Sequence, residues 1–202
     1  MSKEVAKYLT RADLVLGRFI KKYEPVTLAP NNRITLFEAL VKSVIGQQLS
    51  GKAASSILGK LKDQIGGRKP ISPKSIFLTH FKKIGGAGVS ESKARTIVAL
   101  AKMTEAGTIP STRKMKGMSD EEIIEILTSV KGIGRWTVEM ILMFKLGRQD
   151  VMPATDLGVR KGYSIIFGQK ELASPKVILE HSQIWSPYRS FVAKCCWEAA
   201  DG

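Results

Sequence analysis

The sequence predicts an all-α protein whose helices are joined by short polar turns. Serine or threonine repeatedly precedes an apolar stretch with helical spacing, and in three places proline follows the serine. Alternating strand patterns are scarce, and the sequence has no fixed-period repeat or low-complexity tract. From the 202 residues we expect about nine or ten helices, in one domain or two small lobes.

Start and stop signals place the expected helices in order along the chain. Thr35 and Glu38 form a capping-box pattern before the first long apolar stretch. Ser50 is expected to cap the next helix, which Gly66-Gly67 ends. Later helices are expected to begin at Ser72-Pro73, at Ser90, at Ser119 with Glu122 as a second capping box, at Ser174-Pro175 and at Ser186-Pro187.

The charge of the chain is its unusual feature. Lysine and arginine number 32 against 18 aspartates and glutamates, which gives a net charge of +14 and an isoelectric point near 9.9. Such a balance indicates a polyanionic partner, and nucleic acid above all. An anionic membrane is the weaker alternative, because the sequence has no apolar run of about 18 residues and no lysine-rich amphipathic anchor.

The cysteines and the N-terminus bear on the compartment. Cys195 and Cys196 are adjacent, a spacing that suits neither a disulfide framework nor a zinc or iron–sulfur site. The first residues mix both charges with apolar side chains, unlike a signal peptide. We therefore expect a protein of a reducing, intracellular compartment.

Residues 120–146 carry a helix, a glycine turn and a second helix. The first helix is expected to end near Ser129, and the second to begin at Arg135-Trp136-Thr137, after the turn Val130-Lys131-Gly132-Ile133-Gly134. Glycine permits a tight turn and a close approach of backbone. The amides that begin the second helix then point outward, where they can bind a nucleic-acid phosphate without reading bases. An ordinary hairpin of packed helices is the alternative.

A second informative stretch runs from Pro153 to Arg160. A helix is expected to begin at Thr155 or Asp156, because apolar residues with helical spacing follow. The positive end of the helix dipole stabilises a carboxylate at that position. Asp156 is therefore either a simple cap or an anion held ready for chemistry.

Three segments together resemble the helix-hairpin-helix DNA glycosylase superfamily, and most of all its 3-methyladenine, or alkylation-repair, type. They are Val44-Ile45-Gly46-Gln47-Gln48-Leu49-Ser50, then Val130-Lys131-Gly132-Ile133-Gly134-Arg135-Trp136-Thr137, then Pro153-Ala154-Thr155-Asp156-Leu157-Gly158-Val159-Arg160. The likeness covers roughly residues 33 to 200, with the segments in the family's order and separations. It implies a compact two-lobed fold with a cleft between the lobes. We expect a central lobe of residues 35–150, with the hairpin at 128–137, and a second lobe of residues 1–34 and 151–202.

The resemblance implies that Asp156 is the catalytic residue. Cleavage of an N-glycosidic bond passes through a cationic sugar, which a fixed carboxylate stabilises while it orients or deprotonates the attacking water. Bifunctional relatives, which also nick the strand, carry a lysine where this chain has Trp136, so no Schiff base is expected here. We expect a monofunctional glycosylase that removes alkylated bases from duplex DNA without an organic or redox cofactor.

The resemblance also implies which side chains receive the flipped base. Trp136 would line the base pocket and Trp197 would lie beside Asp156, although either tryptophan could instead belong to the core. Met140 and Leu157 stand where some relatives carry pocket tyrosines. The loop 46–50 would fill the vacated stack through Gln48 or Leu49, unless it is a simple turn between helices.

Further residues are expected at the DNA surface. The predicted DNA contacts are Gln47, Gln48, Leu49, Ser50, Lys93, Gly132, Gly134, Arg135 and Thr137. Each charged residue among them, taken alone, is more often a solvated charge than a contact. The backbone carbonyls of Thr128, Val130 and Ile133 match those that hold a sodium or potassium ion in relatives. We expect a monomer that works inside the cell, with the DNA.

Two other functions remain open at this point. A non-catalytic helix-hairpin-helix module would bind DNA structure or damage and release no base. A glycosylase of the same fold could act on another lesion, such as uracil, but a neutral leaving base needs more help from the pocket. Asp156 is the residue that separates enzyme from binder.

Overall fold

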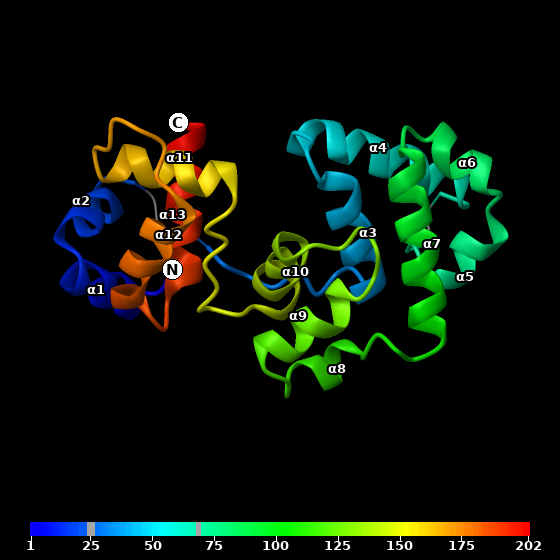
Figure 1. Ribbon diagram of the computed structural model, residues 1–202, viewed down its shortest axis with the longest axis horizontal. Coiled ribbons are helices and arrows are strands. Elements are labelled where there is room, and N and C mark those ends of the chain that lie inside the picture. Colours follow the sequence, from blue (N-terminus) through cyan, green and yellow to red (C-terminus); the bar gives the residue numbers. More distant parts are fainter. Residues whose placement is uncertain (24–26, 68–69) are drawn as a thin grey trace. The chain divides into compact units, whose positions relative to one another are not determined.

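The computed structural model describes residues 1–23, 27–67 and 70–202. Every regular element within these ranges is helical (Figure 1), which confirms the all-α prediction. The ranges contain thirteen α-helices, more than expected, because short helices such as α8 (Thr112–Met115) have no long apolar stretch to announce them. None of the helices described is long and apolar enough to span a bilayer. The chain divides into two compact units, residues 31–146 and residues 1–30 with 147–202.

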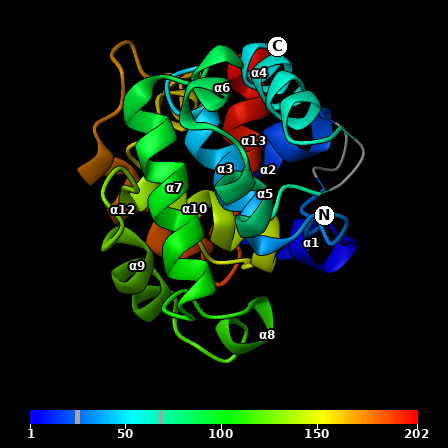
Figure 2. The same ribbon diagram turned by 90° about the vertical axis from the view of Figure 1, so that its right-hand side faces the viewer.

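The unit of residues 31–146 is built around α3. Its helices are α3 (Leu36–Gly46), α4 (Gly51–Gln64), α5 (Pro73–Leu78), α6 (Phe81–Gly86), α7 (Glu91–Glu105), α8, α9 (Asp120–Thr128) and α10 (Arg135–Ile141), which a π-helical turn, Leu142–Leu146, continues. Most apolar side chains of α3 are buried, and α4, α7 and α10 all pack against this helix. Figure 2 shows α7 passing in front of α3, with α10 beside them.

Side-chain caps fix most helix starts in this unit where the sequence predicts them. Each of the following accepts a hydrogen bond from the backbone N–H three residues later: Thr35, Ser50, Ser72, Ser90 and Ser119. The capping box of Ser119 and Glu122 is complete. A capping box at Thr35 would also need the Glu38 side chain to accept the Thr35 N–H, and this second bond was predicted wrongly. Glu38 is buried instead, and its carboxylate pairs with Lys62 at 2.5 Å.

The other unit joins the two ends of the chain. Its helices are α1 (Lys3–Ala12), α2 (Leu14–Lys22), α11 (Leu157–Ile166), α12 (Pro175–His181) and α13 (Arg189–Asp201), with a 3₁₀ turn at Ser182–Trp185. Helices α11 and α13 pack so closely that a Cβ added at Gly162 would lie 1.7 Å from the carbonyl oxygen of Cys196. A residue with a side chain has no room at that crossing, so glycine fixes how these two helices meet.

One helix start in this unit was predicted wrongly. Ser174 caps α12 with Pro175 at its first position, as expected. The Ser186–Pro187 peptide bond is instead cis, and α13 begins at Arg189. The Ser186 hydroxyl donates to the carboxylate of Asp150 at 2.9 Å rather than capping a helix.

Candidate functional site

Asp156 is the N-cap of α11, which confirms a helix start at this position. Its Oδ1 accepts the backbone N–H of Val159 at 2.9 Å. The same oxygen accepts the indole Nε1–H of Trp197 at 2.8 Å. Two donors therefore hold one half-buried carboxylate at the positive end of a helix dipole.

The packing of α13 on α11 explains why Trp197 reaches Asp156. Trp197 follows Cys196, the residue whose carbonyl lies against Gly162 of α11. This crossing brings α13 close to the first turn of α11, where Asp156 sits. Leu157, 53% exposed, is the next residue along. The structure thus brings together three of the predicted site residues, Asp156, Leu157 and Trp197, although Asp156 and Trp197 are 41 residues apart in the sequence.

The glycine hairpin forms as predicted. Helix α9 ends at Thr128, the Ile133 N–H donates to the Val130 carbonyl at 3.0 Å, and α10 begins after its N-cap, Gly134. Among the residues described, no side chain caps the start of α10. Backbone amides at this end therefore lie where an anion can meet them.

Arg135, a predicted DNA contact, is held within the hairpin. Its guanidinium donates to Glu121 at 2.5 and 3.1 Å and lies 3.4 Å from Glu139. The hydrogen bond with Glu121 raises the pKa of Arg135 and lowers the pKa of the Glu121 carboxyl. Arg135 is still more than half exposed, so this pair is screened by water.

The loop 47–50 has one side chain turned inward and two turned outward. Gln47 Nε2 donates to the Gly132 carbonyl at 3.0 Å and to the hydroxyl of Thr137 at 2.9 Å, and Thr137 is buried. These two predicted DNA contacts therefore contact each other through their side chains. Gln48 is exposed in the left-handed region with φ +58°, and Leu49 is 41% exposed.

Lys93, also predicted to contact DNA, makes contacts that the sequence did not predict. Its ammonium donates to the carbonyls of Ile45 at 2.9 Å and Gln47 at 2.7 Å, at the end of α3. Burial lowers the pKa of Lys93. The sequence could not predict this contact, because it depends on how α7 packs on α3.

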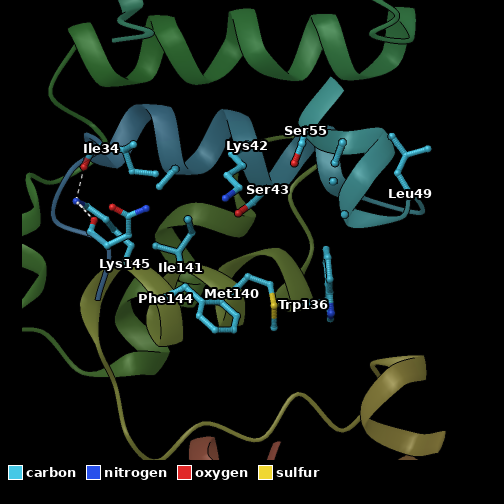
Figure 3. A pocket seen from close by; sticks show the side chains of 15 residues that line it. Ile34, Lys42, Ser43, Leu49, Ser55, Trp136, Met140, Ile141, Phe144 and Lys145 are labelled. Atoms are coloured by element: carbon cyan, nitrogen blue, oxygen red, sulfur yellow. Dashed lines mark hydrogen bonds between the residues drawn. The ribbon is translucent and has the colours of Figure 1, made fainter. Parts of the chain in front are cut away.

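A cavity of about 330 Å³ lies in the unit of residues 31–146. Figure 3 shows Trp136, Met140 and Phe144 on one side of it and Lys42, Ser43 and Leu49 on the other. Trp136 and Met140 were predicted to line a base pocket, whereas Phe144 was missed because it lies in the π-helical turn rather than in a motif. The described residues that line this cavity include no aspartate or glutamate. Leu157 and Trp197, the other two predicted pocket residues, belong to the other unit.

The hairpin carbonyls are the predicted ligands of a monovalent cation. The Val130 carbonyl accepts the Ile133 N–H at 3.0 Å, and a carbonyl oxygen has two lone pairs. Main-chain oxygens of this kind suit a hard cation. Among the described residues, no cluster of histidine, cysteine, aspartate and glutamate could hold a metal ion.

A helix, a glycine turn and a second helix, followed by the capped aspartate of α11, make this a helix-hairpin-helix protein. A family model described as HhH-GPD superfamily base excision DNA repair protein matches residues 41–187, so the chain belongs to this superfamily. The resemblance based on the three sequence segments is thereby confirmed.

Similar proteins cover nearly the whole chain. DNA-3-methyladenine glycosylase 1 of Schizosaccharomyces pombe is 33% identical, over 98% of this chain and 90% of its own length. A solved structure of the S. pombe 3-methyladenine DNA glycosylase in complex with abasic DNA is 34% identical, with a TM-score of 0.89 over 97% of this chain and 96% of that one. A DNA-3-methyladenine glycosidase from Bacillus halodurans is also 34% identical, with a TM-score of 0.84 over 98% of this chain and 89% of that one.

Proposed function

We propose that the protein is a monofunctional DNA glycosylase that hydrolyses the N-glycosidic bond of alkylated bases, 3-methyladenine among them, in duplex DNA. The observation that carries this proposal is the carboxylate of Asp156, held by the Val159 amide and the Trp197 indole. Relatives that match nearly the whole chain include the 3-methyladenine DNA glycosylase of S. pombe, whose name supports the choice of substrate.

The chemistry needs one well-placed carboxylate. Removal of 3-methyladenine breaks the bond between C1′ of the sugar and N9 of the base. The alkylated base is positively charged, so it leaves with the bonding electrons as a neutral molecule and needs no strong general acid. The Asp156 carboxylate stabilises the oxocarbenium-like sugar. Water adds to C1′ and gives up a proton, with the same carboxylate as the group that orients or deprotonates it.

The hairpin and the loop 47–50 are the proposed grip on DNA. Gly134 has no side chain to cover the first amides of α10, which suits the approach of a phosphate. Gln48 and Leu49 are exposed, and one of them would fill the space that the flipped base leaves. The net charge of +14 supports long-range attraction to the duplex.

The proposed enzyme does not cut the strand. Trp136 stands where bifunctional relatives carry the lysine that forms a Schiff base with the sugar. We therefore expect that sodium borohydride traps no covalent adduct between the protein and abasic DNA. An adduct, or a nick without alkali, would contradict this part of the proposal.

A sodium or potassium ion at the hairpin is a further part of the proposal. The carbonyls of Thr128, Val130 and Ile133 would hold it, and their oxygens are ligands that such a cation accepts. The ion would stabilise the turn that presents the amides of α10. We also propose that the protein acts as a monomer, in the compartment that holds the cell's DNA.

The test is base release from duplex DNA that carries 3-methyladenine, compared between the wild-type protein, Asp156→Asn and the matched control Asp201→Asn. Asparagine is itself a good N-cap, so the start of α11 should survive in the first variant. Asp201 is exposed, so we expect Asp201→Asn to behave like wild type. Both should release 3-methyladenine and leave the strand intact until alkali is added. Asp156→Asn should be slower by at least about 100-fold.

Other results would point to the two alternatives. Tight, salt-dependent binding without base release by any of the three proteins would indicate a non-catalytic DNA-binding module. Release of uracil but not of methylated bases would indicate a glycosylase for another lesion.

A further inference from the structure

Three elements of the unit 31–146 are tied together by buried or half-buried polar contacts. They are the loop 47–50, the glycine hairpin and the first turns of α7. Each pair of elements shares at least one hydrogen bond, so the three contacts form a closed triangle. Three side chains, those of Gln47, Lys93 and Thr96, make this triangle.

Lys93 forms the side of the triangle between α7 and the loop. Two of its three N–H bonds are directed at the carbonyls of Ile45 and Gln47. Carbonyls at the end of a helix have no partner within the helix, and α3 ends at Gly46 without a glycine in the left-handed conformation. The ammonium of Lys93 therefore completes the end of α3 and fixes the direction in which the loop leaves it.

Thr96 forms the side between α7 and the hairpin. Its hydroxyl donates to the Lys131 carbonyl at 3.0 Å, and the residue is buried. A Cβ added at Gly132, where φ is +94°, would lie 2.1 Å from Thr96 Oγ1. The hairpin can approach α7 this closely because residue 132 is glycine. Thr96 and Lys93 are three residues apart, on one face of α7.

Gln47 closes the triangle between the loop and the hairpin. Its amide donates to the Gly132 carbonyl and to the buried hydroxyl of Thr137 in α10. The backbone of Gln47 is held by Lys93 while its side chain is held by the hairpin. The next residue, Gln48, has φ +58°. This backbone conformation costs free energy in residues other than glycine, and it persists when the surrounding structure imposes it.

We propose that Lys93 is a positioning residue, which sets the loop 47–50 in register with the hairpin so that both engage the same stretch of DNA. This inference rests on the proposed function, because it assumes that the loop and the hairpin hold the duplex. Lys93 then acts through Gln47 and the loop, not by contact with a phosphate. Its partial desolvation, seen in the lowered pKa, agrees with an ammonium committed to protein carbonyls.

The test compares Lys93→Met with Lys102→Met, an exposed lysine farther along the same helix. The probes are a duplex with 3-methyladenine and a duplex with a stable abasic-site analogue. A residue that contacts one phosphate contributes about 0.9 to the slope of log K against log salt concentration. A positioning residue leaves that slope unchanged and instead slows single-turnover base release, by about tenfold to a hundredfold when the loop is displaced.

We therefore expect Lys93→Met to keep the wild-type salt slope and to release base more slowly, while Lys102→Met matches wild type in release. A slope lower by about 0.9 with normal base release would overturn the inference and make Lys93 a phosphate contact. Wild-type behaviour of Lys93→Met in both measurements would also overturn it. Failure of the wild-type protein itself to release base would instead refute the proposed function, and this inference with it.

Two further variants distinguish positioning from a loss of folding. Lys93→Arg keeps donors for two carbonyls and should recover part of the rate. Gln47→Leu removes another side of the triangle, so the double variant Lys93→Met with Gln47→Leu should lose clearly less than the product of the two single losses. Independent, multiplicative losses, or an arginine variant as slow as methionine, would contradict a shared positioning role.

Discussion

The indole of Trp197 donates a hydrogen bond to Oδ1 of Asp156 across 41 residues of sequence. The two residues lie on different helices, and the glycine crossing between α11 and α13 brings them together. A hydrogen bond to a charged group is stronger than one between neutral groups. Trp197 thus orients the carboxylate proposed to face the sugar, beyond any role that its ring has toward a base.

Replacement of Trp197 by phenylalanine should separate these two roles. Trp197→Phe keeps an aromatic ring and removes the N–H donor, which is worth about 1.5–3 kcal/mol when its partner is charged. We expect single-turnover release of 3-methyladenine to slow by at least about tenfold. In an Asp156→Asn background the same replacement should have little further effect. An equal loss in both backgrounds would show that Trp197 does not act through Asp156.

The crossing at Gly162 should be intolerant of any side chain. In Gly162→Ala the new Cβ meets backbone atoms of Cys196, which cannot move without shifting α13. We expect a loss of at least about 3 kcal/mol in the free energy of unfolding, which for a chain of this length lowers Tm by about 6–12 °C. Thermal unfolding followed by circular dichroism measures it.

Gly59→Ala is the matched control for that measurement. Gly59 lies exposed inside α4, and an added Cβ meets no atom within 4 Å. Alanine there should stabilise the protein by about 0.5–1 kcal/mol. Equal effects of the two replacements would contradict the close crossing of α11 and α13.

The parts of this fold that could be predicted from sequence are those that local signals specify. Ser90 and Ser119 cap helices where their spacing to apolar residues indicates, and Asp156 caps α11 for the same reason. The capping box at Thr35 failed in part because burial turned Glu38 toward Lys62. A local pattern contains no information about which face of a helix another helix will cover.

In the candidate site too, local motifs predicted some features, while others depend on how the helices pack. The motifs identified the hairpin and Asp156, and the resemblance identified Trp197. The inward turn of Gln47 and the contacts of Lys93 could not be predicted, because they depend on long-range packing of α7 on α3. Phe144, which lines the cavity with Trp136, was missed because it stands outside every motif.

Asp13 is a buried carboxylate of the unit formed by residues 1–30 and 147–202, and its loss should be costly. Its Oδ1 caps α2 through Val15 and Leu16, and its Oδ2 accepts the indole N–H of the buried Trp185 at 3.2 Å. Asp13→Ala should therefore destabilise the protein by about 2–4 kcal/mol, the sum of a lost cap and an unsatisfied indole. Asp13→Asn, which keeps a cap, should lose less.

Denaturant unfolding measures this difference, with Asp63→Ala as the control. Asp63 is exposed near the end of α4, so its replacement should change stability by less than about 0.5 kcal/mol. A small effect of Asp13→Ala, comparable to that of the control, would mean that solvent replaces both of the contacts.

The two cysteines should be unreactive in the folded protein. Both are free and almost fully buried, and burial raises the pKa of Cys195 to about 12 and also raises the pKa of Cys196. The thiolate is the reactive form, so a thiol reagent at pH 8 should modify neither residue until denaturant is added. Rapid modification of one thiol per folded molecule would contradict the close packing of α13.

The same burial makes stability depend on pH at the alkaline end. The thiols ionise near pH 9 in the unfolded chain but at higher pH in the folded one, so the folded state binds more protons between these values. Their contribution to stability is fully present below about pH 9 and is lost as the pH rises toward the folded pKa. We expect Tm to fall between pH 9 and 11, and to fall less in Cys195→Ala. An equal fall in that variant would assign the alkaline loss to other groups.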